Sequence, residues 1–300
     1  MKILVSGASG LVGTELVPAL MAAGHEVNRL VRDKSRATRG DVFWNPLAGE
    51  IDPMIVGGCD AVINLAGEAI VGRWTAQKKE RIRDSRIAGT RTIAEALAKH
   101  RGRPRILLNA SAIGFYGSRG DQLLDETSQP GSGDFLSEVC KVWEGAAAPA
   151  AHAGVRVVFL RFGVILSAKG GALAKMLPPF RLGLGGKIGS GKQYMSWVAL
   201  DDTVGAILHA LHTDRLCGAV NVVAPEPVTN LTYTKTLGHV LVRPTVFPMP
   251  ALAARAAFGQ MADELLLTSQ RVRPAKLLAS GYAFKFPTLE PALRHVLGQP

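Results

Sequence analysis

The segment Met1-Lys-Ile-Leu-Val-Ser-Gly-Ala-Ser-Gly-Leu-Val-Gly13 decides the fold of this chain. Its apolar residues 3–5 predict a short buried strand, and the mostly apolar residues 11–23 have the length of a helix. Between them stand glycines at a regular spacing, Gly7, Gly10 and Gly13. Glycine permits a sharp turn close to a ligand, and the first amides of a helix have no internal acceptor, so they bind anions. The segment therefore predicts a phosphate-binding turn, with a strand-to-helix turn that binds nothing as the alternative.

The residue after the second strand indicates which dinucleotide binds. Residues 26–31 predict that strand, and the residue about 20 positions past the glycines is Arg32. An acid at this place holds a free ribose hydroxyl, whereas an arginine suits a 2′-phosphate. Asp33 is able to accept hydroxyls, but the segment Arg32-Asp-Lys-Ser-Arg36 carries three cations against one anion. We therefore expect NADP(H) rather than NAD(H), with a solvated basic loop as the alternative.

Composition excludes several classes of protein. With 300 residues, 47% hydrophobic and 20% charged, the composition is that of a globular protein. No apolar run approaches the roughly 18 residues of a membrane span, and no signal peptide is visible, so we expect a cytoplasmic protein without a membrane partner. The net charge is +11, but the cations are scattered, with the densest run at Lys78-Lys-Glu-Arg-Ile-Arg83, and aromatic residues make up only 6%. We therefore expect no nucleic-acid partner.

The cysteines predict neither disulfides nor a metal site. Cys59, Cys140 and Cys217 lie far apart and in no CxxC spacing. We expect reduced thiols and no bound metal. The sequence leaves a homodimer open.

Strands and helices alternate along the first half of the chain, which predicts a parallel α/β sheet. Further strands are expected at residues 41–44, 59–67, 105–111 and 155–161, and helices at 75–100 and from about residue 134. Ligands lie at the carboxyl ends of strands in such a sheet, so Leu65, Ala66 and Gly67 are expected to contact the adenosine half of the cofactor. Arg86, in the helix at 75–100, either reaches a phosphate or faces water.

The predicted fold is a Rossmann-type doubly wound parallel sheet with a smaller, mostly C-terminal lobe that covers the substrate. We expect an NADP-binding domain at residues 1–165, completed by about 192–224. Residues 166–191 and 225–300 are expected to form the substrate-side lobe and a C-terminal helical segment. Within this lobe, residues 167–191 carry many glycines and a Pro-Pro pair, so we expect irregular structure there.

These motifs resemble the extended short-chain dehydrogenase/reductase family. The resemblance is carried by the glycine motif, by Asn64-Leu-Ala-Gly67, by the Tyr116-Gly117 turn and by Arg161-Phe-Gly-Val164. The segments 178–186, 189–193 and 269–274 are similar to its atypical epimerase branch, described as nucleoside-diphosphate-sugar-epimerase-like. The resemblance runs from Met1 to about Leu297.

The catalytic positions depart from the family pattern. Extended members use a Ser or Thr four residues before the Tyr-Gly turn, and a Tyr-Xaa-Xaa-Xaa-Lys pair on the next helix. Here Ala112 stands at the first position and Ser137 at the tyrosine, so only Lys141 remains. Serine is far less acidic than a phenol, so proton exchange by the usual triad is not expected.

Other groups on the same side are candidate proton donors, in the order Tyr116, Ser111, Glu138 and Cys140. Each has a plainer interpretation, as a core tyrosine, a strand-end serine, a surface acid or a buried thiol. The resemblance implies that Lys141 binds the nicotinamide ribose and that Val164 meets the carboxamide. The catalytic candidates are therefore Lys141, Tyr116 and Ser111.

The expected cofactor contacts are Gly7, Ser9, Gly10, Leu11, Val12, Gly13, Val31, Arg32, Leu65, Ala66, Gly67, Arg86, Lys141 and Val164. The expected function is that of an NADP(H)-binding oxidoreductase or epimerase-like enzyme with a degenerate Ser/Tyr/Lys triad, acting on an unidentified small molecule. The alternative is an NADP(H)-binding sensor or scaffold with little or no catalysis.

Overall fold

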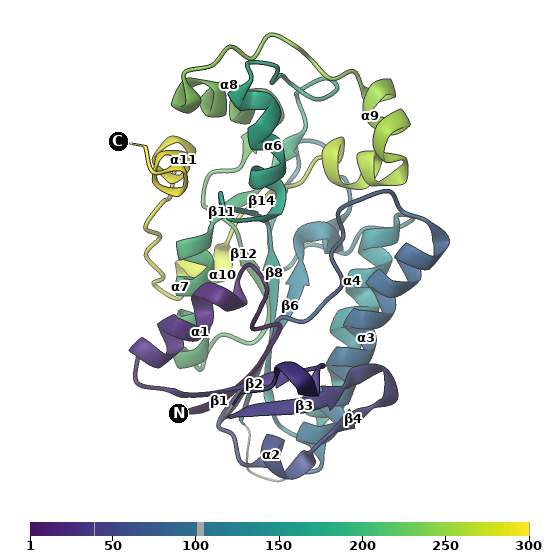
Figure 1. Cartoon of the computed structure of the whole chain (residues 1–300), viewed down its shortest axis with the longest axis vertical. Helices are drawn as coiled ribbons and strands as arrows, with labels where there is room; N and C mark the ends of the chain where they lie inside the picture. The colour runs from purple at the N-terminus through teal and green to yellow at the C-terminus, as the bar shows by residue number, and fades with distance from the viewer. Residues whose placement is uncertain (39, 101–104, 300) are drawn as a thin grey trace.

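The computed structural model of the protein describes residues 1–38, 40–100 and 105–299. In these residues, a mainly parallel eight-stranded sheet in the order β12-β8-β6-β5-β1-β2-β3-β4 forms the centre (Figure 1). Only β4, at one edge, runs antiparallel to its neighbour β3. The strands are β1 Lys2–Ser6, β2 Glu26–Val31, β3 Asp41–Asn45, β4 Glu50–Ile51, β5 Ala61–Asn64, β6 Ile106–Ala112, β8 Arg156–Phe162 and β12 Gly218–Val222. The predicted doubly wound sheet is confirmed.

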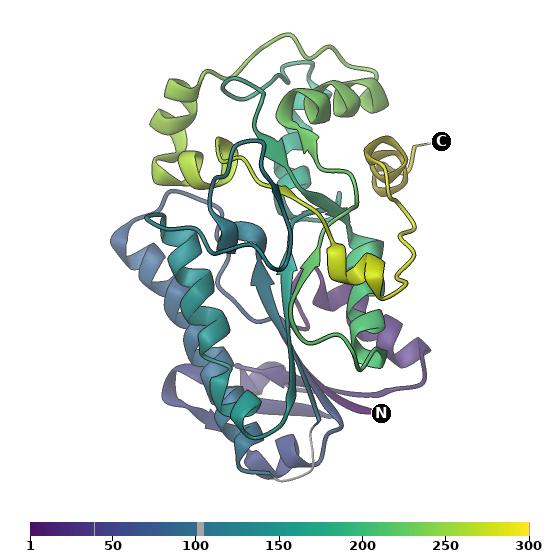
Figure 2. The same ribbon diagram turned by 180° about the vertical axis from the view of Figure 1, so that it is seen from behind.

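Helices cover both faces of the sheet (Figures 1 and 2). One face is covered by α1 Gly13–Ala22 and α7 Leu200–His212, and the other by α2 Pro53–Gly57, α3 Ala76–Ala98, α4 Phe135–Gly145 and α5 Ala148–His152. Side chains alternate along a strand, so Ile3 and Val5 of β1 pack with the α1 face while Leu4 packs with the α3 face. Because both faces are buried, the strand reads as a continuous apolar run.

The other helices lie mainly beyond the carboxyl ends of the strands, at the upper end of Figure 1. They are α6 Gly171–Arg181, α8 Asn230–Leu241, α9 Ala251–Phe258 and α11 Leu289–Leu297. Helix α10 Ala275–Ala279 instead packs against β12, on the face of the sheet that α7 covers. Three strand pairs accompany them: β9 Val164–Leu166 with β11 Trp197–Ala199, β10 Tyr194–Met195 with β13 Val228–Thr229, and β7 Leu123–Leu124 with β14 Arg271–Val272. The chain thus places a second layer of structure over the edge of the sheet where ligands bind in this fold.

Helix α6 corrects the expectation that residues 167–191 are irregular throughout. Pro178 and Pro179 lie inside this helix, where a proline costs about 3 kcal/mol. However, the apolar residues Leu173, Leu177 and Phe180 share one face and are buried in a cluster that also holds residues of α8 and α11. Burying such a side chain contributes about 1.5–3 kcal/mol, so tertiary packing outweighs the local preference of the prolines.

Candidate functional site

The glycine turn connects β1 to α1 and presses against the end of β5. Gly7 has φ +68°, and a Cβ on it would lie 2.7 Å from the carbonyl carbon of Leu65. A Cβ on Gly13 would lie 2.3 Å from the carbonyl oxygen of Gly7. No side chain fits at either position, so the start of α1 is held close beside the loop after β5. The turn thus has the form of the predicted cradle, with the start of α1 at the carboxyl end of β1.

The other predicted cofactor contacts surround this turn. Ser9 and Gly10 are exposed, Leu11 and Val12 are half-buried at the start of α1, Val31 ends β2, and Leu65, Ala66 and Gly67 follow β5. The structure therefore brings the predicted residues of β1, β2 and β5 to one edge. Their contact with a cofactor stays a prediction.

Buried polar side chains join the strand ends beneath the turn. Ser6 Oγ donates to Asn64 Oδ1 at 2.5 Å, and the amides of Leu65 and Ala66 donate to Ser6 Oγ. Asn64 Nδ2 in turn donates to Asn109 Oδ1 at 2.7 Å. Ser6, Asn64 and Asn109 are register partners on adjacent strands, so each side chain meets the next. Because every step is hydrogen-bonded, this ladder fixes the position of the loop after β5.

Arg86 of α3 fastens the same loop from the other side. Its Nη1 donates to the carbonyls of Glu68 and Ile82 at 3.0 and 2.9 Å, and its guanidinium lies over the ring of Trp143. Burial lowers the pKa of Arg86. The guanidinium is therefore directed toward the loop and Trp143, while the residue as a whole is half-buried. A contact between Arg86 and a cofactor phosphate stays a prediction.

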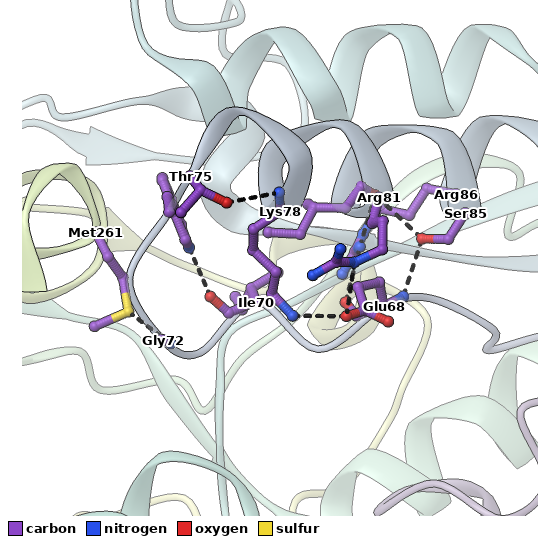
Figure 3. Close-up of polar contacts among 11 residues, drawn as sticks. Glu68, Ile70, Gly72, Thr75, Lys78, Arg81, Ser85, Arg86 and Met261 are labelled. Carbon is purple, nitrogen blue, oxygen red and sulfur yellow. Dashed lines mark hydrogen bonds and ion pairs between the residues drawn. The ribbon is translucent and has the colours of Figure 1, made fainter.

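Glu68 stands among cations at the start of α3 (Figure 3). Lys78 Nζ lies 2.6 Å from Glu68 Oε1, and Arg81 Nε lies 3.8 Å from the same oxygen. The hydrogen bond from Lys78 chiefly lowers the pKa of Glu68, and the charges of Lys78, Arg81 and Arg32 lower it further. Arg32 is exposed just after β2. The charge of the cation predicted for the 2′-phosphate therefore acts on the same carboxylate as Lys78 and Arg81.

The loop that carries Glu68 is tied down along its length. The Ser85 hydroxyl accepts a hydrogen bond from the Glu68 amide, and Trp74 Nε1 donates to the Ile70 carbonyl at 2.7 Å. The amide of Gly72 lies 3.3 Å from the sulfur of Met261, which belongs to the C-terminal part of the chain (Figure 3). The sequence analysis did not name Glu68, Lys78 and Arg81, which the structure brings together beside the loop after β5. The only signal was the basic run at 78–83.

Helix α4 carries the one residue of the usual triad that remains. Lys141 forms an ion pair with Glu138, and both side chains reach solvent. Ser137, at the position of the usual tyrosine, is fully buried, and its hydroxyl donates to the Asp134 carbonyl at 3.2 Å. Cys140 is also buried, and this burial is the main reason that its pKa is raised to about 12. Of these residues, Lys141 and Glu138 are the ionisable groups accessible to a ligand.

Tyr116 and Ser111 belong to one buried network. Tyr116 is fully buried, and its hydroxyl donates to Asn221 Oδ1 at 2.7 Å and accepts from Arg161 Nη1 at 3.0 Å. Burial is the main reason that the pKa of Tyr116 rises to about 12. Ser111 Oγ donates to Glu144 Oε1, and Glu144 also accepts two hydrogen bonds at 2.8 Å from Arg161. These contacts fit the plainer interpretations of a core tyrosine and a strand-end serine.

Val164 begins β9 above this network. Its amide donates to the Ser196 carbonyl at 2.9 Å, so that group is engaged within the protein. A contact between Val164 and a carboxamide stays a prediction.

Among residues 1–38, 40–100 and 105–299, no group of three or more His, Cys, Asp or Glu side chains is placed to hold a metal ion. In the same ranges, no helix has both the length and the apolar character needed to cross a bilayer.

The fold and site together define a protein of the extended short-chain dehydrogenase/reductase type, built on a Rossmann-like sheet. Comparison with protein families agrees. The chain belongs to the NAD dependent epimerase/dehydratase family, whose model matches residues 3–222. Residues 249–296 match a second model, described as a domain of unknown function (DUF1731).

Relatives match the chain over nearly its whole length. The epimerase family protein Mb2239 of Mycobacterium bovis is 43% identical over 299 residues, which cover 99% of this chain and 98% of the relative. The human epimerase family protein SDR39U1 is 37% identical over 300 residues, covering 99% of this chain and all of the relative. A crystal structure of human SDR39U1 (isoform 2) with NADPH superposes with a TM-score of 0.91 at 36% identity and covers 99% of each chain.

More distant structures share the fold alone. UDP-glucose 4-epimerase of Thermus thermophilus, in complex with NAD, superposes with a TM-score of 0.77 at 20% identity and covers 99% of this chain. The resemblance to extended dehydrogenases and to their epimerase branch is thus confirmed at the level of family and fold.

Proposed function

We propose that this protein binds NADP(H) and acts as an oxidoreductase or epimerase-like enzyme on a small molecule. The observation that carries the proposal is the glycine turn, in which a Cβ on Gly13 would lie 2.3 Å from the Gly7 carbonyl oxygen at the start of α1. Such a turn accommodates a pyrophosphate at the helix N-terminus. The crystallised relative with NADPH supports the same assignment.

The charges near the turn fit the phosphorylated form of the cofactor. Arg32 is exposed after β2 and acts on Glu68 together with Lys78 and Arg81. Cations at this place suit a 2′-phosphate, whereas an acid would be needed to hold two ribose hydroxyls. The bound cofactor would supply the hydride donor or acceptor.

The acid–base chemistry would rest on α4. Lys141 and Glu138 form an ion pair that reaches solvent, whereas the hydroxyls of Ser137 and Tyr116 are buried and engaged. We assign to Lys141 the binding of the nicotinamide ribose, and to the Lys141–Glu138 pair the exchange of a proton with the substrate. Residues 166–191 and 225–300 would cover the substrate.

A second candidate function is an NADP(H) sensor without turnover. One observation favours it: Ala112 and the buried Ser137 stand where the usual reactive hydroxyl and phenol would be. In that case the cofactor itself would be the signal, and the covering lobe would respond to its binding.

One experiment separates the two candidates. NADPH is mixed with the purified protein and with quinones, enones, aldehydes or nucleotide sugars, and the absorbance of the reduced nicotinamide is followed. If the protein is an enzyme, we expect turnover that Lys141→Met reduces by about 100-fold, because a positioned proton donor contributes about that factor or more. Tyr116→Phe should leave turnover nearly unchanged, because its hydroxyl is buried. Tight binding of NADPH without oxidation by any compound would favour the sensor, and no binding at all would overturn both.

A further inference from the structure

Glu68 is an anion among cations, directly after the residues predicted to contact the cofactor, Leu65, Ala66 and Gly67. Its carboxylate contacts Lys78 and Arg81, and it lies within electrostatic reach of Arg32. Lys78 and Arg81 both extend from α3 toward Glu68 in Figure 3. Two cations thus contact a single carboxylate, and the charge of Arg32, which the sequence assigns to the 2′-phosphate, acts on the same group.

We propose that Glu68 is an internal counter-ion that holds Lys78 and Arg81 ready for the 2′-phosphate, and so sets the preference of this protein between NADPH and NADH. The inference rests on the proposed function, since it concerns the same cofactor. It assigns Lys78 and Arg81 to the phosphate site together with Arg32. It gives Glu68 an opposing role, because its charge repels the group that these cations attract.

The backbone of the Glu68 loop is secured without the carboxylate. The Glu68 amide donates to Ser85 Oγ at 3.0 Å, and its carbonyl accepts from Arg86 Nη1 at 3.0 Å. The carboxylate therefore is not needed to hold the main chain. The side chains of Glu68 and Arg81 are 35% and 50% exposed, so both have room to change partner when an anion enters.

Electrostatics gives the direction of each effect. A 2′-phosphate carries about −1.5 to −2 charges and competes with the carboxylate for the same cations. Glutamine at position 68 keeps the size of the side chain and one acceptor oxygen, replaces the other oxygen with an amide donor, and removes the charge. Glu68→Gln therefore releases Lys78 and Arg81 to the phosphate and removes a repulsion. NADH lacks the phosphate, so its affinity should not respond in this way.

The test compares dissociation constants for NADPH and NADH, measured by calorimetry at low salt. We expect Glu68→Gln to tighten NADPH by about tenfold and to change NADH by less than about twofold, as suits one unit charge acting over a few ångströms near a surface. Arg81→Ala should weaken NADPH by about the same factor and leave NADH unaffected. Adenosine 2′,5′-bisphosphate, compared with 5′-AMP, should reproduce both results without the nicotinamide.

Matched controls lie on the same helix. Asp84 pairs with the adjacent Arg83 at 2.7 Å, and neither contacts Glu68. Asp84→Asn and Arg83→Ala make the same chemical changes and should leave both constants unaltered. The thermal midpoint of each variant shows whether it is folded.

The remaining outcomes overturn the inference. If Glu68→Gln weakens both cofactors equally, the carboxylate is only a structural element of the loop. If it changes neither, or if Asp84→Asn acts as strongly, the effect does not arise from this site. If the wild-type protein binds neither cofactor, both the proposed function and this inference are wrong. If the wild-type protein binds NADPH but Glu68→Gln does not change the ratio of the NADPH and NADH constants, only this inference is wrong.

Discussion

Three hydroxyl side chains lie near the carboxyl edge of the sheet, and each is already engaged as a donor. Ser111 donates to Glu144, Tyr116 to Asn221, and Ser137 to the Asp134 carbonyl. All three residues are buried. To exchange a proton with a ligand, each would have to give up a buried hydrogen bond, which costs about 1–3 kcal/mol. These three hydroxyls therefore stabilise the structure at this edge of the sheet and are not free to exchange a proton.

The thiols allow a prediction at the same scale. Cys59 and Cys140 are buried, whereas Cys217 is exposed. Desolvation raises the pKa of both buried thiols, that of Cys140 from 9.0 to about 12. The thiolate is the reactive form, so we expect iodoacetamide at about pH 8 to alkylate Cys217 and to spare the other two in the native protein. Peptide mass spectrometry gives the result, and urea-unfolded protein, in which all three should react, is the control.

The raised pKa of Cys140 also determines the direction in which stability changes with pH. The contribution of the protonated Cys140 thiol is fully present below pH 9.0 and is lost as the pH rises toward about 12. Alkylation of Cys140 as fast as Cys217 at neutral pH would contradict the described burial.

At the scale of the elements, the start of α1 leaves no room for a side chain at Gly13. A Cβ at Gly13 would lie within 2.7 Å of three backbone atoms, of Gly7 and of Ala8. Backbone cannot move aside as a side chain does, so Gly13→Ala should open the turn, lower stability by about 1–3 kcal/mol and abolish NADPH binding. Chemical unfolding and calorimetry measure the two effects.

Gly145, the last residue of α4, is the matched control. A Cβ there would meet nothing within 4 Å. Alanine is the better helix former, so Gly145→Ala should raise stability by up to about 1 kcal/mol and leave binding unchanged. If the Gly13→Ala protein is stable and still binds NADPH, the glycine turn is not the phosphate-binding site.

Elements whose causes are local could be predicted from the sequence. The order of β1, the glycine turn and α1 follows from residues 1–23, and the register of β8 with β6 buries the apolar run predicted at 155–161. Helix α6 could not be predicted, because Pro178 and Pro179 oppose it locally and only packing against distant helices favours it. For the same reason the sequence showed the basic run at 78–83, but not which cation would meet Glu68 when the loop folds back.

At the scale of the whole molecule, the C-terminal part is bonded to the start of α4. The carboxylate of Glu264 accepts hydrogen bonds from the amides of Phe135 and Leu136, at 3.1 and 2.8 Å. Gln260 donates to Glu264 and accepts from Lys79 of α3. An acid at a helix N-terminus satisfies amides that have no partner within the helix. One short segment thus holds the first turns of α3 and α4 together.

This contact predicts a loss that reaches across the molecule. Glu264→Ala should lower stability by about 1–3 kcal/mol, since it leaves two amides without their acceptor. It should also speed hydrogen exchange at Phe135 and Leu136, which lie more than a hundred residues away in sequence. Asp263→Ala is the control, because its ion pair with Arg255 is exposed and should contribute less than about 1 kcal/mol. Unchanged exchange at both amides would show that the helix start does not depend on Glu264.

The bond from Glu264 to α4 bears on how such proteins diverge. The matched family models end at residue 222 and begin again at residue 249, so the two halves look separable in an alignment. Yet the later half supplies the acceptor for two amides of the earlier one, as well as the sulfur beside Gly72. A chimera that joins the two parts from different relatives should therefore lose stability unless its later part also brings an acid to this position.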